Sequence, residues 1–288
     1  MFTRIRRAAA VILVFCMLAA FVPGSADAAA PKEEPSASVR IYYNGLFSGM
    51  ACYYGSTLYL PVENLCTFMG VGVQVMGDSA SGTYTVVGDN FVITSTAGNY
   101  YTVANHRYFY SPEEYLFIGE TLYISLPIMQ KVFNITSVLA DDMQRVDIDL
   151  GSFSVIKGGV SYYEDRYSAD DITWLCRIIY SEAHTESLEG AIGVGNVVLN
   201  RVASNKYPNT IYDVVFDKEF GFQFSPTLDG SVYFEPDERS TAAAYMCLEG
   251  YNTVGNSLYF VNPFAADDTW FKTMRTFYKR IGNHDFYL

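Results

Sequence analysis

A single glutamate, Glu182, has the position that acid catalysis requires. It follows an apolar stripe at helical spacing, formed by Ile172, Leu175, Cys176 and Ile179. Residues three and seven positions apart lie on one face of a helix, so Glu182 is predicted to end this apolar face. Burial and the negative end of the helix dipole both disfavour a charged carboxylate and raise its pKa. A carboxylic acid that stays protonated near neutral pH can protonate the bridging oxygen of a glycosidic bond. Periodicity alone leaves an ordinary solvated glutamate at a helix end as the alternative.

Two helices are predicted to position Glu182. Ser168 and Asp171 have the spacing of a near capping box, which starts the first helix. A turn at His184-Thr185 leads into a second helix, expected over about residues 187–202. Its small residues between positions 190 and 195 weaken the helix but allow another backbone to approach closely. Glu186 lies at the start of this helix, where a carboxylate caps free N–H groups, with a role at the substrate as the alternative.

The second half of the chain carries a series of motifs. In order, they are Tyr180-Ser181-Glu182-Ala183-His184-Thr185-Glu186, Glu189-Gly190, Val197-Val198-Leu199-Asn200-Arg201-Val202, Tyr207-Pro208-Asn209-Thr210-Ile211, Val214-Val215, Gln223-Phe224-Ser225, Tyr259-Phe260-Val261-Asn262-Pro263 and Ile281-Gly282-Asn283-His284-Asp285-Phe286-Tyr287. Over about residues 171–288, their order and spacing resemble the cell wall hydrolase family of spore cortex-lytic enzymes. The resemblance implies that Glu182, at the glutamate of the family's Tyr-x-Glu-Ala-Arg-Gly-Glu motif, is the catalytic acid. The family's Arg-Gly is His184-Thr185 here, so substrate contacts and loop shape near the acid are expected to differ.

The resemblance also implies a reaction. It is cleavage of the bond between N-acetylmuramic acid and N-acetylglucosamine in peptidoglycan, by a domain that resembles lysozyme-like lytic transglycosylases. A hydrolase needs a second carboxylate about 5 to 10 Å from the acid. A lytic transglycosylase needs one acid/base, because the muramic C6 hydroxyl attacks its own anomeric carbon. Glu182 is the one strong candidate for the acid in the motif. Glu186 could serve as the second carboxylate, but its interpretation as a helix cap competes with that role, so the one-acid route is preferred.

Further polar residues in the matched segments are candidates for substrate binding. With Glu186, they are Gln223, Ser225, Tyr259, Asn262 and His284, and Phe224 and Phe260 are candidate apolar floors. Each has a structural alternative. Asn262 precedes a proline and can simply start a turn, and Tyr259 lies in a strand-like run typical of a core. His284 either orients a neighbour or bonds a backbone carbonyl.

Residues 39–150 are predicted to form a small α+β domain with two β-α-β-like halves. Alternating and short apolar runs broken by Gly and Asn indicate strands. The run that starts at Gly55 recurs at Gly119, and each copy is followed by a short helical stripe. This arrangement resembles the stalk-like domain named after copper amine oxidase N-termini, which implies an accessory module of the cell envelope. A generic α+β domain without a binding role is the alternative.

The remaining segments indicate export and two domains. Three arginines between residues 4 and 7 precede an apolar run over residues 8–22, which is typical of a signal peptide cleaved after Ala28. Residues 29–38 are expected to form a flexible tether, 151–168 a linker and 169–288 a mainly helical catalytic domain. After cleavage no membrane span is expected. Export permits disulfides between Cys52, Cys66, Cys176 and Cys247, but buried free thiols are at least as compatible with this apolar chain.

Composition limits the partners. The formal net charge is −12, so nucleic acid is not expected, and peptidoglycan glycan strands are the predicted partner. No cofactor or metal is expected. A zinc amidase acting on the muramoyl-peptide bond needs about three protein ligands. Residues 169–288 contain only two histidines, His184 and His284, so this enzyme class is not favoured. The other alternative is a non-catalytic wall-binding protein with a degenerate hydrolase domain, to which the His184-Thr185 departure points.

Overall fold

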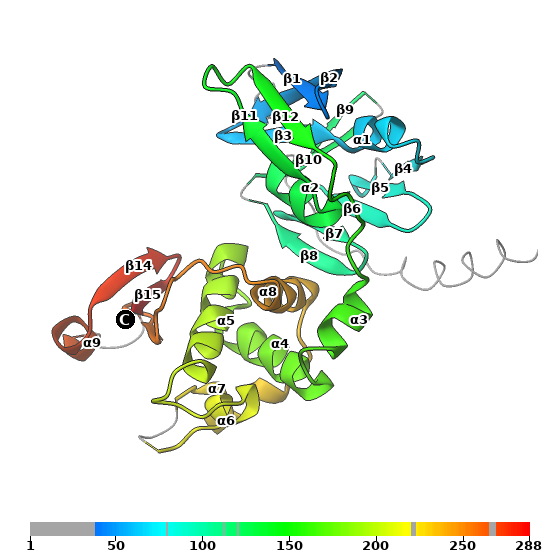
Figure 1. Cartoon of the computed structure of the whole chain (residues 1–288). Helices are drawn as coiled ribbons and strands as arrows, with labels where there is room; N and C mark the ends of the chain where they lie inside the picture. Colours follow the sequence, from blue (N-terminus) through cyan, green and yellow to red (C-terminus); the bar gives the residue numbers. More distant parts are fainter. Residues whose placement is uncertain (1–37, 79, 112, 120, 220–222, 265–268) are drawn as a thin grey trace, which may run out of the picture. The chain divides into compact units, whose positions relative to one another are not determined.

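The computed structural model describes residues 38–288 except 79, 112, 120, 220–222 and 265–268 (Figure 1). The signal peptide and residues 29–37 of the expected tether lie outside the described residues. Within the described part, no helix has the length and apolar character needed to cross a membrane. The fold is α+β, as expected: strands dominate up to Asp149 and helices dominate afterwards.

A mixed sheet forms the centre of the N-terminal region. Its strands, in spatial order, are β11 (Thr136–Leu139), β12 (Arg145–Asp149), β1 (Ser38–Tyr43), β2 (Leu46–Tyr54), β3 (Thr57–Pro61), β10 (Thr121–Ser125) and β9 (Leu116–Ile118). β1 pairs in parallel with β12, and the other neighbours are antiparallel. The two copies of the repeated motif form β3 and β10, which are neighbouring strands of this sheet. Each copy continues into a short helix, α1 (Val62–Phe68) or α2 (Leu126–Phe133), with its apolar side in the core.

An antiparallel meander forms a second sheet in this region. It consists of β4 (Gln74–Asp78), β5 (Thr83–Val87), β6 (Val92–Thr96), β7 (Tyr101–Ala104) and β8 (Arg107–Tyr110). Val86, Ile93 and Phe109 of the meander belong to the same apolar core as the first sheet. One side of β7 and β8 instead packs on the helices that follow, where Tyr108 stacks on Tyr245 with ring centroids 5.1 Å apart.

The segment expected to be a linker, 151–168, is structured. Phe153, Val155 and Ile156 pack on the N-terminal core, and the segment then forms α3 (Gly159–Glu164). The C-terminal helices are α4 (Ala169–Ala183), α5 (Leu188–Val202), α6 (Ile211–Val215), α7 (Pro226–Asp229), α8 (Glu238–Leu248) and α9 (Thr269–Met274). A third sheet of β13 (Tyr259–Val261), β15 (His284–Tyr287) and β14 (Phe277–Ile281) covers one side of α5.

Buried ion pairing and free thiols complete the fold. Arg107 of β8 makes two hydrogen bonds to Glu249, at 2.7 and 2.6 Å, which attaches the meander to the end of α8.

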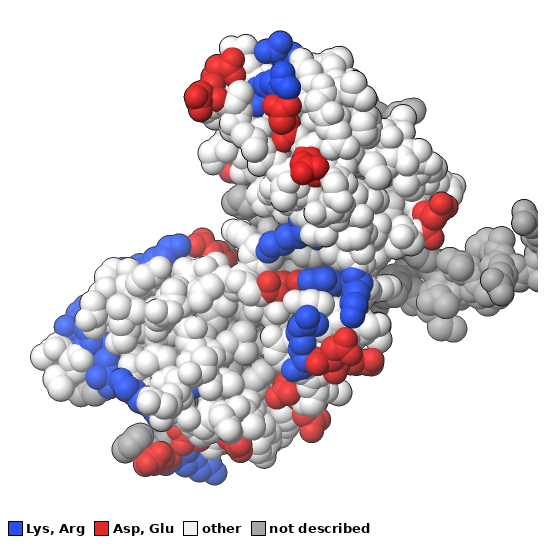
Figure 2. All heavy atoms as spheres, viewed as in Figure 1, with Lys and Arg blue, Asp and Glu red and all other residues white. Residues whose placement is uncertain are grey.

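Cys52, Cys66, Cys176 and Cys247 are buried free thiols, in agreement with the interpretation that bridges are not required. On the face shown in Figure 2, acidic and basic side chains are interspersed, and basic ones gather near β14 and α9.

Candidate active site

Glu182 lies in the last turn of α4, as the apolar stripe predicts. Ser168 caps this helix and forms the expected capping box with Asp171, and His184 is its C-cap. Leu175 and Ile179 on the same face are fully buried, while Glu182 itself is partly exposed. Desolvation by burial raises the pKa of Glu182 to about 7, Arg201 opposes this rise, and the negative charge of Asp229 adds to it. The side chain can therefore both hold and release a proton near neutral pH.

Arg201 is the cation that acts on Glu182, and it carried no predicted role. Only 4% of this residue of α5 is exposed, and its Nε–H donates to the carbonyl of Leu258 at 2.8 Å. Its Nη1 is buried and has no hydrogen-bond partner among the described residues. Three aromatic rings surround the guanidinium, with centroids 5.0 Å away for Tyr207, 5.0 Å for Phe224 and 5.8 Å for Tyr259. The sequence signal was a charged Arg within the run 197–202, where four of the six residues are apolar, since a buried charge needs a specific environment.

Asp229 is a second residue that carried no predicted role. It ends the short helix α7, and its Oδ1 accepts the backbone N–H of Ser231 at 2.8 Å. Hydrogen bonds from Ser231 lower the pKa of this exposed carboxylate, so it is ionised at neutral pH. Asp229 therefore places a negative charge near the raised-pKa acid, an arrangement of two carboxyl groups with different protonation states.

Glu186 is buried and bound to the β14–β15 turn. Its Oε2 accepts the backbone N–H of Asn283 at 3.0 Å, and its Oε1 accepts the Asn283 side chain at 2.8 Å. Burial alone would raise the pKa of Glu186, but these bonds, with contributions from His284 and Arg239, lower it overall. The prediction that Glu186 caps α5 is wrong. The cap is Ser187, whose side chain accepts the N–H of Gly190, because Glu186 is directed to the turn instead.

His284 lies beside this carboxylate. The residue is 6% exposed in β15, and its ring packs against Phe260 with centroids 5.1 Å apart. Burial lowers the pKa of His284, and the charge of Glu186 opposes that change. Its Nδ1 is buried and has no hydrogen-bond partner among the described residues, so both roles considered for His284 stay predictions.

The other predicted substrate residues differ in their surroundings. Gln223 is partly exposed and next to the buried Phe224, whereas Ser225 is exposed at the start of α7. Tyr259 of β13 shares a hydrogen bond with Tyr207 and lies near Arg275, whose Cζ is 4.4 Å from its ring centroid. The side chain of Asn262 accepts the N–H of Phe264 at 2.9 Å, which is the turn expected as its alternative. The ring centroids of Phe224 and Phe260 lie 6.2 Å apart, and Phe224 is a buried core residue against which Phe260 packs.

Comparisons with known proteins concern the C-terminal half. Residues 185–287 match the family model described as Cell Wall Hydrolase. The C-terminal part of the chain thus resembles cell wall hydrolases. The match begins three residues beyond Glu182, so the role of that residue rests on its own geometry.

Among the described residues, no group of three or more His, Cys, Asp or Glu side chains is placed to hold a metal ion.

Similar proteins include spore cortex-lytic enzymes. That of Bacillus cereus is 36% identical over 120 residues, which are 42% of this chain and 45% of the relative. That of Oceanobacillus iheyensis is 35% identical over 120 residues, 42% of each chain. The chain thus spans less than half the length of the curated relatives it matches. A solved catalytic domain of the germination-specific lytic transglycosylase SleB from Bacillus anthracis is 35% identical, with a TM-score of 0.40, and the alignment covers 43% of this chain and 98% of that one.

Substituting Gly282 is expected to destabilise the protein by about 2 to 3 kcal/mol. Gly282 has a φ of +56°, and a Cβ there would overlap the Oε2 of Glu186. Gly282→Ala therefore strains the turn and displaces the carboxylate. Gly250→Ala is the matched control, because Gly250 has a φ of +90° but open space around a Cβ. Urea unfolding at pH 7 compares the two. Equal losses of stability would show that backbone strain acts alone and that the contact with Glu186 has no effect.

Proposed function

We propose that the C-terminal domain cleaves peptidoglycan between N-acetylmuramic acid and N-acetylglucosamine, as a lytic transglycosylase with Glu182 as its single acid/base. The observation that carries this proposal is a partly exposed carboxyl group with a pKa of about 7 at the end of an apolar helix face. Similarity to cell wall hydrolases over residues 185–287 supports the substrate class.

In the proposed reaction, the Glu182 carboxylic acid donates its proton to the bridging oxygen as the bond to the muramic anomeric carbon breaks. The resulting carboxylate then accepts the proton of the muramic C6 hydroxyl, whose oxygen bonds to the same anomeric carbon. The products are a new sugar end with a free hydroxyl and a 1,6-anhydro muramic end, and no water is consumed. Glu186 is not assigned to this chemistry because both of its carboxylate oxygens are bound to Asn283.

A hydrolytic reaction is the second candidate, and Asp229 is the observation that favours it. Its charge acts on Glu182, and as an ionised, exposed carboxylate it has the properties of a water-activating base. In that reaction water attacks the anomeric carbon and the muramic product has a reducing end. The two routes differ in product mass by one water molecule.

The test is digestion of purified peptidoglycan by the full-length protein, followed by mass spectrometry of the soluble fragments. Anhydro-muramic ends are expected. Reducing ends that disappear in Asp229→Asn would replace the one-acid route by hydrolysis. Binding of peptidoglycan without release of any fragment would contradict an enzyme and favour a non-catalytic wall-binding protein. Release of free stem peptides, blocked by a chelator, would identify an amidase.

The pH dependence of the reaction follows from Glu182. Because the free enzyme must hold a proton on this side chain, kcat/KM is expected to fall tenfold per pH unit above about pH 7. Initial rates between pH 5 and 9 measure this limb. A rate that continues to increase up to pH 9 would show that Glu182 is not the proton donor.

We also propose an extracytoplasmic location, consistent with the apolar leader segment and with the wall substrate. The N-terminal α+β domain is proposed to act there as an accessory module of the kind its resemblance to stalk domains implies.

A further inference from the structure

A cavity lies where the N-terminal meander meets the starts of α5 and α8. Its volume is about 620 Å³, within the range of small-molecule sites. The loop between β6 and β7 contributes Tyr100, β7 and β8 contribute Tyr101 and Tyr110, and the helices contribute Glu189, Glu238 and Arg239. None of these residues has a role in the proposed reaction at Glu182.

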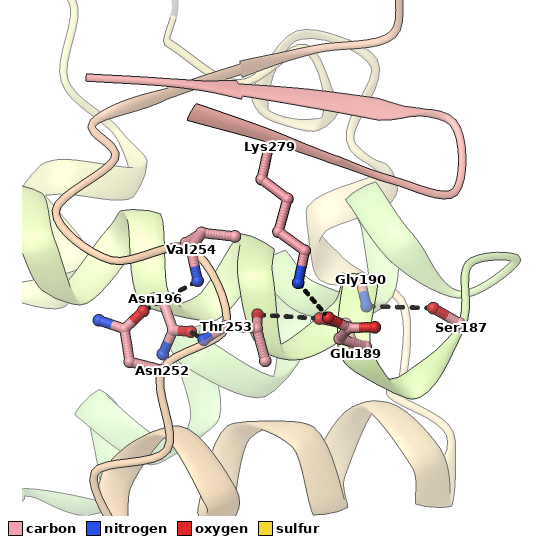
Figure 3. A network of polar contacts seen from close by, with 8 residues as sticks. All are labelled: Ser187, Glu189, Gly190, Asn196, Asn252, Thr253, Val254 and Lys279. Carbon is pink, nitrogen blue, oxygen red and sulfur yellow. Dashed lines mark hydrogen bonds and ion pairs between the residues drawn. The ribbon is translucent and has the colours of Figure 1, made fainter. Parts of the chain in front are cut away.

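The walls of this cavity are held in place by contacts within the lining and by contacts to residues outside it. The hydroxyl of Tyr101 donates to Glu238 at 3.4 Å, and the Tyr110 ring packs edge-on against Tyr251 at 5.9 Å between centroids. Lys279 extends from β14 to the Glu189 carboxylate at 2.6 Å (Figure 3). Arg239 donates to the backbone carbonyl of His184. The polar groups are therefore pre-positioned, which lowers the cost of binding a ligand.

The charges of the lining indicate a neutral ligand. The carboxylates of Glu189 and Glu238 are matched in number by the cations of Arg239 and of Lys279, which binds Glu189. A strongly charged ligand therefore gains no net attraction. Tyr100 is 43% exposed and offers an aromatic face. Aromatic faces together with charged hydrogen-bonding groups suit a sugar, whose C–H face is apolar and whose hydroxyls both donate and accept.

We propose that this cavity binds amino sugars of the peptidoglycan glycan strand, away from the bond that is cut. The proposal rests on the proposed function for its substrate class. The cavity residues Leu188 and Glu189 lie at the start of α5, which is separated from the end of α4, where Glu182 lies, by the short turn that contains Glu186. A strand held there remains attached to the enzyme between cleavage events, because binding energy from remote parts of a substrate keeps the reacting part in place.

The test measures binding of a glycan without stem peptides, in the full-length chain carrying Glu182→Gln so that no turnover occurs. The probe is a tetrasaccharide of alternating N-acetylglucosamine and N-acetylmuramic acid whose lactyl carboxyl groups are amidated, which keeps it neutral as the amide bond to a stem peptide does. Its binding is measured by calorimetry. Adding Tyr100→Ala is expected to raise Kd about tenfold, as for a central aromatic contact. Adding Tyr100→Phe keeps the ring and is expected to retain the affinity. Phe47→Ala is the matched control, because Phe47 is a 59% exposed aromatic of β2 outside the cavity.

The outcomes separate this proposal from the proposed function. An unchanged Kd for Tyr100→Ala, or an equal loss for Phe47→Ala, overturns the sugar site. Binding of the isolated stem peptide with Tyr100-dependent affinity, and no binding of the glycan, also overturns it. None of these three results bears on cleavage, which is measured separately with the protein that retains Glu182. Conversely, failure of that protein to release fragments contradicts the proposed function, while a Tyr100-dependent glycan Kd still supports the site.

Discussion

Glu182→Gln is expected to lower the rate of fragment release from peptidoglycan by about 10²- to 10⁴-fold, the range of a general acid/base contribution. Glutamine keeps the shape and hydrogen-bonding capacity of the side chain but has no proton to donate at the bridging oxygen. Initial rates at pH 6, where Glu182 is mostly protonated, measure the loss. Affinity for peptidoglycan is expected to be retained, because the substitution removes a reacting group and leaves the surrounding surface unchanged.

Glu235→Gln is the matched control for this loss. The Glu235 side chain is 88% exposed, and its contact with Arg177 is an ion pair of 3.4 Å. The same chemical change at this site is expected to leave the rate within about twofold, since exposed ion pairs contribute little. Full activity of Glu182→Gln would remove the catalytic assignment, and a loss shared by both variants would show that the change acts through folding.

Stability gives an independent check on Glu182. Its pKa in the folded protein is raised from 4.5 to about 7. Between these values the folded state binds more protons than the unfolded state, so this contribution to stability is present below pH 4.5 and is lost as pH rises toward 7. Glu182→Gln is expected to remove that decrease. Unfolding curves at pH 5 and pH 8 measure it, and an identical pH dependence in both proteins would contradict a raised pKa.

Local patterns in the sequence were sufficient for the elements around Glu182. The capping box at Ser168 starts α4, and the small residues near the start of α5 allow close contacts. A Cβ at Gly195, for example, would overlap Cys247 and Ile179. These are properties of neighbouring residues and their periods, which a sequence displays directly. The repeat at Gly55 and Gly119 predicted two β-α-β-like halves. Its copies form the paired strands β3 and β10, each followed by a short helix, but the next strands, β4 and β11, lie in different sheets.

Contacts between distant segments could not be predicted in the same way. Glu186 binds Asn283, which is 97 positions away, and that pairing decides that Ser187 caps α5. The sequence showed a carboxylate at a helix start, which is compatible with both arrangements. The separation of the strands into a mixed sheet and a meander also depends on long-range pairing, because alternation indicates a strand but not its neighbours.

Arg201→Met is expected to move the alkaline limb of kcat/KM to higher pH by about one unit and to lower the maximal rate about tenfold. Arg201 opposes the rise in the pKa of Glu182, and Asp229 supports it, so removing the cation leaves both burial and Asp229 acting in the same direction. The acid then holds its proton more firmly. Donation to the bridging oxygen becomes slower, since the carboxylate it leaves is stabilised less.

The control for Arg201→Met has to separate charge from packing. Arg201→Lys retains a cation in the aromatic surroundings and is expected to keep the limb near that of the unchanged protein, while both variants lose the bond from Nε to Leu258. Arg177→Met is a second control on α4, because Arg177 pairs with the exposed Glu235. Rates across pH 5 to 9 and urea unfolding are measured together. A limb that stays in place in Arg201→Met, in a folded protein, would show that this guanidinium stabilises the aromatic cluster and does not tune the acid.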